Sequence, residues 1–278
     1  MNAGELWVAD GFSLADVRRA EKAAMSAWPP AKEYELDGWL VRRTPDTSSR
    51  RANSAVARTW RSGVEVETAI LGVEGFYNEH GAVPRFQMSP TSEPLILDTI
   101  LAERDYDIEA PVRVMTVDPA SIDDAVKWQV RLDEVSAPAW RDAFAATAPS
   151  VAEADGRTAM VERARSRGLS VAYASIRDNA DRVASIGVGV FSTPSAAGDA
   201  DGWSLVFSMN TLPDHRRQGM GRAIVAALMG RAVAFGCDTA YLQVETNNPG
   251  AIAVYEGLGF RDLYAYHYRS LFGTGENG

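Results

Sequence analysis

The chain has 278 residues, of which 46% are hydrophobic and 23% charged, and its formal net charge is −9. This composition predicts a globular protein with one large domain or two of ordinary size, and no apolar run approaches the roughly 20 residues that span a bilayer. The single cysteine, Cys237, excludes an internal disulfide framework and suits a cytoplasmic protein; the acidic balance argues against nucleic acid as a partner.

The first half of the chain becomes regular from residue 67 onward. Hydrophobic spacing there predicts, in chain order, a helix, a strand, a helix and a strand, over Glu67–His80, Arg85–Met88, Pro94–Arg104 and Val112–Val117.

The second half alternates more clearly between helix and strand patterns. Helices are predicted over Ala137–Thr147, Val151–Arg165, Gln218–Phe235 and Pro249–Gly257. Strands are predicted over Ser170–Ile176, Val183–Phe191, Trp203–Thr211, Thr239–Glu245 and Phe260–Leu271. Residues 193–202 read as a loop, and residues 273–278 as a disordered tail.

The two halves repeat one order of elements. Phe86-Gln-Met88 resembles Leu242-Gln-Val244, and Asp105-Tyr106 stands where Gly259-Phe260 stands in the second half. This order suggests a degenerate internal duplication. Coincidence is the alternative, because any α/β protein alternates helices with strands.

An anion-binding loop is predicted between the strand ending at Thr211 and the helix after it. Gly219 and Gly221 let the backbone approach a ligand, and the free amides of the first helical turn attract negative charge. Arg216, Arg217 and Arg222 add positive charge, so a pyrophosphate is the natural ligand.

Three phosphate-binding motifs are alternatives for this loop. A Walker A loop needs Gly-Lys-Ser/Thr, which this segment lacks. A dinucleotide fingerprint needs a small residue where Ile224 stands, and needs its glycines directly after the strand. The remaining pattern, Arg/Gln-x-x-Gly-x-Gly/Ala, is fulfilled by Arg216, Gly219 and Gly221.

The segment from Leu242 to Phe260 completes a pattern with that loop. Asn248 is followed three residues later by Ala251, seven residues later by Tyr255, and then by Gly259-Phe260. Together the two motifs resemble the GNAT superfamily of N-acetyltransferases, over roughly residues 126–271.

The resemblance implies an α/β fold with a mixed, mostly antiparallel sheet flanked by helices and preceded by a degenerate copy. It divides the chain into an N-terminal GNAT-like lobe (residues 1–118), a catalytic domain (119–272) and a short tail (273–278).

The resemblance also implies acetyl-CoA as cosubstrate and assigns the residues that bind it. Backbone groups of Met209, Asn210 and Thr211 would bind the pantetheine. The pyrophosphate would lie on the amides of Arg217, Gln218, Gly219, Met220, Gly221 and Arg222. Asn248 would cap the helix that starts at Pro249 and contact the cofactor, and Tyr255 would protonate the departing thiolate. An ordinary half-buried aromatic is the alternative for Tyr255.

The general base departs from the family pattern. Some members carry Glu five residues before the Asn, where this chain has Gln243. Glu245, two residues on and hence on the same strand face, is the candidate; a surface Glu at a strand end is the alternative. His80, His215 and His267 lack metal-ligand spacing, so no metal is expected.

The N-terminal half has no Gly-x-Gly loop and is not expected to bind coenzyme A. Arg42, Arg43, Arg50 and Arg51 are candidates for binding a substrate carboxylate, with plain surface charge as the alternative. The two-lobed layout is loosely similar to bacterial GNAT proteins that include stand-alone N-acetylglutamate synthases.

Three functions follow from these patterns. The first is direct acetyl transfer to the primary amine of a small molecule, such as the amino acid glutamate, by a monomer or homodimer without nucleic-acid or membrane partners. The alternatives are a non-catalytic module that binds or senses coenzyme A, and a protein or peptide N-acetyltransferase.

Overall fold

The computed structural model describes residues 5–60, 63–123, 127–194 and 202–272. Its contacts divide the chain into two compact units. The first comprises Met1–Arg18, Pro30–Arg113 and Leu263–Gly278, and the second comprises Arg19–Pro29 and Val114–Asp262. The first unit, built mainly from the N-terminal half, therefore also contains the C-terminal segment from Leu263. The second unit, built mainly from the C-terminal half, also contains Arg19–Pro29. The predicted domain boundary at residue 118 stays a prediction.

The first unit is built on a sheet with the strand order β2-β3-β4-β5-β12, with β1 on β12. These strands are β1 (Trp7–Val8), β2 (Lys32–Leu36), β3 (Trp39–Arg43), β4 (Ala55–Val56), β5 (Arg85–Met88) and β12 (Arg261–Ser270). The pairs are antiparallel except β4 with β5, which is parallel. Helices α2 (Val66–Glu79) and α3 (Leu97–Glu103) flank the sheet, and β6 (Asp107–Val117) begins in this unit.

The core of the first unit lies between its sheet and its helices. Trp39 and Val41 of β3 and Phe86 and Met88 of β5 are buried in one cluster with apolar side chains of α2 and α3. Because side chains alternate along a strand, Arg42, which follows Val41, and Gln87, which lies between Phe86 and Met88, point to the opposite face of the sheet.

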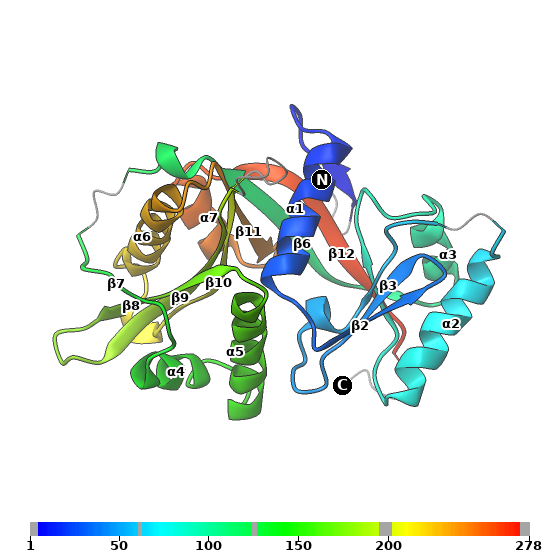
Figure 1. The fold of residues 1–278 in the computed structure, drawn as a ribbon, viewed down its shortest axis with the longest axis horizontal. Coiled ribbons are helices and arrows are strands. Elements are labelled where there is room, and N and C mark those ends of the chain that lie inside the picture. The colour runs from blue at the N-terminus through cyan, green and yellow to red at the C-terminus, as the bar shows by residue number, and fades with distance from the viewer. Residues whose placement is uncertain (1–4, 61–62, 124–126, 195–201, 273–278) are drawn as a thin grey trace. The chain divides into compact units, whose positions relative to one another are not determined.

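The second unit has the strand order β6-β11-β10-β9-β8-β7. Besides the end of β6, these are β7 (Arg131–Asp133), β8 (Ser170–Arg177), β9 (Val183–Ser192), β10 (Trp203–Thr211) and β11 (Thr239–Glu245). Its helices are α4 (Pro138–Ala145), α5 (Val151–Ser166), α6 (Met220–Ala234), α7 (Pro249–Glu256) and most of α1 (Leu14–Ala27). Figure 1 shows α6 and α7 on one side of this sheet and α4 and α5 on the other.

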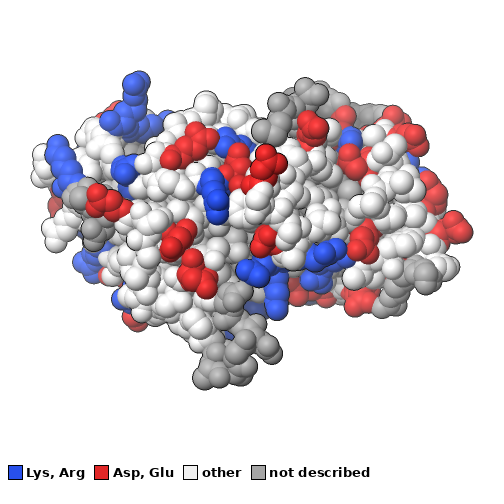
Figure 2. All heavy atoms as spheres, turned by 90° about the horizontal axis from the view of Figure 1, so that it is seen from above, with Lys and Arg blue, Asp and Glu red and all other residues white. Residues whose placement is uncertain are grey.

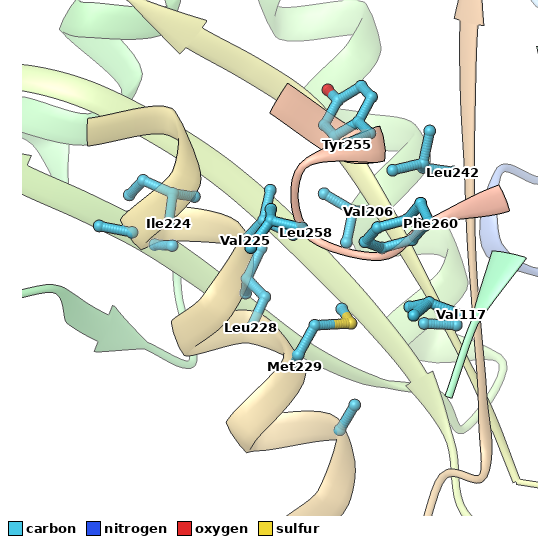
Figure 3. Close-up of a cluster of buried hydrophobic side chains, with 14 of the residues drawn as sticks. Val117, Val206, Ile224, Val225, Leu228, Met229, Leu242, Tyr255, Leu258 and Phe260 are labelled. Carbon is cyan, nitrogen blue, oxygen red and sulfur yellow. The ribbon is translucent and has the colours of Figure 1, made fainter. Parts of the chain in front are cut away.

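Helix α6 packs closely on the sheet of the second unit. Its side chains Ile224, Leu228 and Met229 are fully buried in one cluster with Val206 of β10 and Phe260, all labelled in Figure 3. Gly187 of β9 allows the close approach: a Cβ there would lie 2.6 Å from the Cγ2 atom of Ile224. The sheet therefore holds the start of α6 rigidly against the end of β10.

The predicted α/β fold, with a mixed and mostly antiparallel sheet flanked by helices, is confirmed. Every predicted helix and strand is present, with ends that differ by a few residues. Helix α1 and strands β1, β2, β3, β4 and β7 were not predicted. Most of the predicted 193–202 loop and the 273–278 tail lie outside the described residues.

Both halves of the chain run strand, helix, strand, helix, strand. The order β4-α2-β5-α3-β6 matches β10-α6-β11-α7-β12. In each half, the two strands that enclose the first helix pair in parallel. This shared order supports the duplication hypothesis more strongly than the short sequence similarities do.

Candidate active site

Strands β10 and β11 separate before either of them ends. Their parallel pairing begins at Trp203 and Thr239 and stops at Val206 and Leu242, although β10 continues to Thr211. On the other edge of β10, the register with β9 shifts between Phe207 and Asn210, and Ser208 has a φ of 49°. This bulge bends β10 away from β11. The β11 side of its last residues therefore has no strand partner among the described residues.

The loop after β10 leads directly into the start of α6. Gly219 is the N-cap residue of that helix with a φ of 82°, and Arg217 also has a positive φ, of 62°. A Cβ on Gly219 would meet no atom within 4 Å, so backbone conformation and not crowding requires glycine here. Residues 216–219 are exposed. The first helical turn therefore begins at an exposed loop, and amides at such a helix start attract anions in general.

Three side chains fix this loop by binding backbone carbonyls. Arg216 Nε donates to the Thr211 carbonyl at 3.1 Å, and Arg222 Nη1 donates to the Gly257 carbonyl at 2.7 Å. Trp128 Nε1 donates to the Gln218 carbonyl at 2.8 Å. Two of the three predicted arginines therefore hold the loop and α7 in place. Trp128 was missed, because its sequence signal is only a single indole in a polar stretch.

Asn248 ends the turn that joins β11 to α7. Its Oδ1 atom accepts a hydrogen bond from the Ala251 amide at 3.1 Å, and Pro249 occupies the first helical position. The predicted capping role is confirmed. This cap fixes the direction in which α7 leaves the strand, and so the position of Tyr255 two turns along.

Tyr255 lies at the edge of the core of the second unit. Its side chain is 8% exposed and contacts the ring of Phe260, with the ring centroids 6.1 Å apart. Figure 3 shows its hydroxyl turned away from the other labelled side chains. Burial raises the pKa of Tyr255 to about 12, so the hydroxyl stays protonated near neutral pH and is a proton donor.

Glu245 is the last residue of β11 and is exposed. Val244 beside it is buried and Gln243 is half-buried, so Glu245 and Gln243 share the face opposite Val244. The Glu245 carbonyl accepts the amide of Asn248 at 3.0 Å. Glu245 therefore lies at the end of β11, and its carbonyl is hydrogen-bonded to the residue that caps α7.

The four candidate arginines of the N-terminal half all lie in the first unit. Arg50 forms an ion pair with Glu109, and Arg43 Nη1 donates to Asn53 Oδ1 at 2.8 Å. These two have protein partners. Arg42 is buried and donates only to uncharged groups of Ser54 and Gln87.

The described residues hold no group of three or more His, Cys, Asp or Glu placed to bind a metal ion. In the same parts of the chain, no helix combines the length and the apolar character needed to cross a bilayer.

The sequence and the fold are similar to those of known proteins. A family model described as "Probable histone acetyltransferase Rv0428c C-terminal" matches residues 14–269. The uncharacterized N-acetyltransferase YobR of Bacillus subtilis is 25% identical over 260 residues, which cover 91% of this chain and 98% of that protein. The [ribosomal protein bS18]-alanine N-acetyltransferase of Escherichia coli is 40% identical over 57 residues, only 20% of this chain and 38% of that protein.

Among solved structures, a GCN5-related N-acetyltransferase from Kribbella flavida superposes with a TM-score of 0.66 at 16% identity, covering 96% of this chain and 98% of that one. The fold is therefore shared along nearly the whole chain, and the family match extends over both units. The chain belongs to the family of the Rv0428c C-terminal acetyltransferase region and is a GNAT N-acetyltransferase.

Proposed function

We propose that this chain transfers the acetyl group of acetyl-CoA to the primary amine of a small molecule, with an amino acid such as glutamate as the first candidate. The observation that carries the proposal is the loss of pairing beyond Val206 and Leu242. The end of β10 therefore has no strand partner on its β11 side among the described residues, directly before the loop that leads to α6. The neighbouring strand, β11, leads into α7, which carries Tyr255.

The residues present fit acetyl-CoA. Its pantetheine arm is extended and carries two amides, which suits the segment Met209, Asn210 and Thr211, where β10 no longer pairs with β11. Its pyrophosphate suits the amides from Arg217 to Arg222, which the positive φ angles of Arg217 and Gly219 orient at the helix start. Asn248 would contact the pantetheine from the cap of α7.

The proposed chemistry is a direct attack of a neutral amine on the thioester carbon. A backbone amide at the β10 bulge would donate a hydrogen bond to the oxygen that becomes negative. Tyr255 would give its proton to the leaving thiolate, which keeps that sulfur from attacking in reverse. Glu245 would accept the proton that the ammonium form of the substrate must lose first.

The test is thiol release from acetyl-CoA with a panel of amines. The panel should contain L-glutamate, L-glutamine, other free amino acids and amino sugars, each against buffer alone. Turnover with at least one small amine, identified by mass as its N-acetyl product, supports the proposal. Binding of acetyl-CoA without turnover on any member would favour a sensing module instead.

A second candidate is N-acetylation of a protein or peptide. It is favoured by the 57-residue match to an enzyme whose name states a ribosomal-protein substrate and by the word "histone" in the name of the family. Peptides with a free N-terminal alanine, and peptides with an internal lysine, belong in the same assay. A kcat/KM at least about tenfold above that of every small amine would decide for this candidate.

A further inference from the structure

Arg42 is a fully enclosed cation on β3 of the first unit. Its side chain is 2% exposed. Nε donates to the Ser54 carbonyl at 3.1 Å, and Nη2 donates to the Ser54 hydroxyl at 2.6 Å and to Gln87 Oε1 at 2.7 Å. All three acceptors are neutral. The hydrogen bonds are satisfied, but the positive charge has no ion-pair partner among the described residues.

Arg51 is a second cation at the same place. It lies on the short 3-10 helix Arg50–Ala52 and forms a side-chain hydrogen bond with Tyr266. Its Nε atom is buried and has no hydrogen-bond partner among the described residues. Burial, and to a smaller extent the charge of Arg51, lowers the pKa of Arg42, so the two cations are within electrostatic reach of each other.

Two tyrosines of β12 complete this group. Tyr266 and Tyr268 are 2% and 3% exposed, and their hydroxyls lie 3.5 Å apart. They share one face of β12, and Tyr268 pairs with Gln87 across the sheet. Arg42, Gln87 and Tyr268 therefore lie side by side on the sheet face opposite α2 and α3. Arginine guanidinium groups and tyrosine hydroxyl groups both donate hydrogen bonds to anions.

Several other arginines of the first unit form ion pairs. Arg50 and Arg85 pair with Glu109, Arg104 with Glu67 and Glu74, and Arg269 with Asp98. On the molecular face in Figure 2, blue and red side chains are interspersed. Buried charges are normally paired, because desolvating an unpaired cation is costly.

We propose that Arg42 and Arg51, with the hydroxyls of Tyr266 and Tyr268, form a binding site for the carboxylate group of a small molecule. A carboxylate is planar, carries one charge and accepts two parallel hydrogen bonds from a guanidinium. A phosphate is larger and carries more charge, which suits so enclosed a group less well. The carboxylate of the ligand would supply the negative charge that Arg42 and Arg51 do not find among the described residues.

This proposal gives the first unit a role of its own and rests only partly on the proposed function. A free amino acid carries such a carboxylate, so the ligand can be the acetyl acceptor or an effector of the same class. Binding is independent of acetyl-CoA chemistry, and the two are tested by separate readouts.

The test is binding of L-glutamate and acetate to the full chain, by calorimetry and thermal unfolding at constant ionic strength. Acetamide is the neutral probe, and phosphate and sulfate are the competing anions. Saturable binding of a carboxylate, with weaker phosphate and no acetamide binding, is expected. No carboxylate binding, or equal affinity for sulfate or phosphate, would overturn the proposal.

Variants locate the site. Arg51→Gln should weaken carboxylate binding at least about tenfold, the loss expected from one charge-assisted hydrogen bond, and Arg51→Lys should recover part of it. Arg58→Gln, at an exposed arginine of the same unit, is the matched control and should change nothing. If Arg51→Gln and Arg58→Gln bind equally well, the site is elsewhere and the proposal fails.

Gln87→Glu is the most specific variant. It places a carboxylate beside Arg42 Nη2, where Oε1 of Gln87 now lies. The variant should unfold at a higher temperature and lose the stabilisation by added carboxylate, because it carries its own anion. Retained carboxylate binding in this variant would contradict the proposal. Acetyl-CoA affinity should stay unchanged in all these variants, so failure of the proposed function appears separately, as absent acetyl-CoA binding or thiol release.

Discussion

Val206 and Leu242 are the last residues through which β10 and β11 pair. Up to that point the two strands form an ordinary parallel ladder, and beyond it β10 continues through a bulge while β11 turns at Asn248 into α7. Beyond this point the β11 side of β10 has no strand partner among the described residues, while the Asn248 cap at the end of β11 sets the position of Tyr255. Two neighbouring backbone features therefore underlie the proposed cofactor site and the proposed acid.

Replacement of Tyr255 by Phe should lower kcat about a hundredfold or more, the usual size of a general-acid contribution, with little change in the KM for acetyl-CoA. The ring and its contact with Phe260 remain, so the fold should persist. Steady-state kinetics check this. An unchanged kcat would remove Tyr255 from the mechanism.

The raised pKa of Tyr255, about 12, also predicts a pH dependence of stability. The folded state holds the phenol proton more tightly than the unfolded chain, in which the ordinary pKa is 10.0. The stabilisation is complete below about pH 10 and is lost as the pH rises toward 12. Between those values Tyr255→Phe should lose less stability than the native protein in denaturant unfolding.

The Glu245→Gln variant tests the proposed base. A base must be ionised to accept a proton, so the native kcat should fall on the acidic side of its pH profile. In the variant, which cannot ionise, that acidic limb should vanish or move and kcat should drop. The matched control is Glu256→Gln, at the exposed last residue of α7. An acidic limb identical in Glu245→Gln and native protein contradicts the assignment.

Trp128→Phe should weaken acetyl-CoA binding about two- to tenfold, because it removes the hydrogen bond to the Gln218 carbonyl and frees the phosphate loop. The value of kcat at saturating cofactor should not change, since no reacting atom is near the indole in the proposed mechanism. Calorimetry with coenzyme A measures the first quantity. A drop in kcat with an unchanged dissociation constant would show that Trp128 acts elsewhere.

Asp98 of the first unit accepts hydrogen bonds from His267 Nε2 at 2.8 Å and from Arg269 Nε at 2.9 Å. Burial alone raises the pKa of Asp98, but these bonds and charges outweigh it and hold the pKa well below 3.8. The stabilisation is present above that pH and is lost as the pH falls below it. Asp98→Asn should cost about 2 kcal/mol at neutral pH, and its stability should vary less with acidification.

Much of the second unit could be predicted from sequence, because its helices and strands have clear hydrophobic periods. Several of its glycines also lie where the backbone conformation requires them. Gly219 was expected from the helix start, and its positive φ agrees. Asn248 was expected to cap α7, and it does. Such features are local: a turn or a cap depends on neighbouring residues that a sequence displays in order.

The missed features depend on residues distant in sequence. Strands β2, β3 and β4 have two to five residues each, too few for a period to be recognised. The hydrogen bond from Trp128 to Gln218 spans 90 residues, and the group of Arg42, Gln87 and Tyr268 forms only when β12 joins the first sheet. No local sequence pattern predicts these contacts, because they form between residues that only the tertiary structure brings together.

The central claim is that acetyl-CoA binds where β10 and β11 separate, and a crystal structure with coenzyme A tests it most directly. We expect the pantetheine along Met209–Thr211, the pyrophosphate on the amides of residues 217–222, and the sulfur within hydrogen-bond reach of the Tyr255 hydroxyl. Coenzyme A bound elsewhere, or with its pyrophosphate away from the start of α6, would contradict the account.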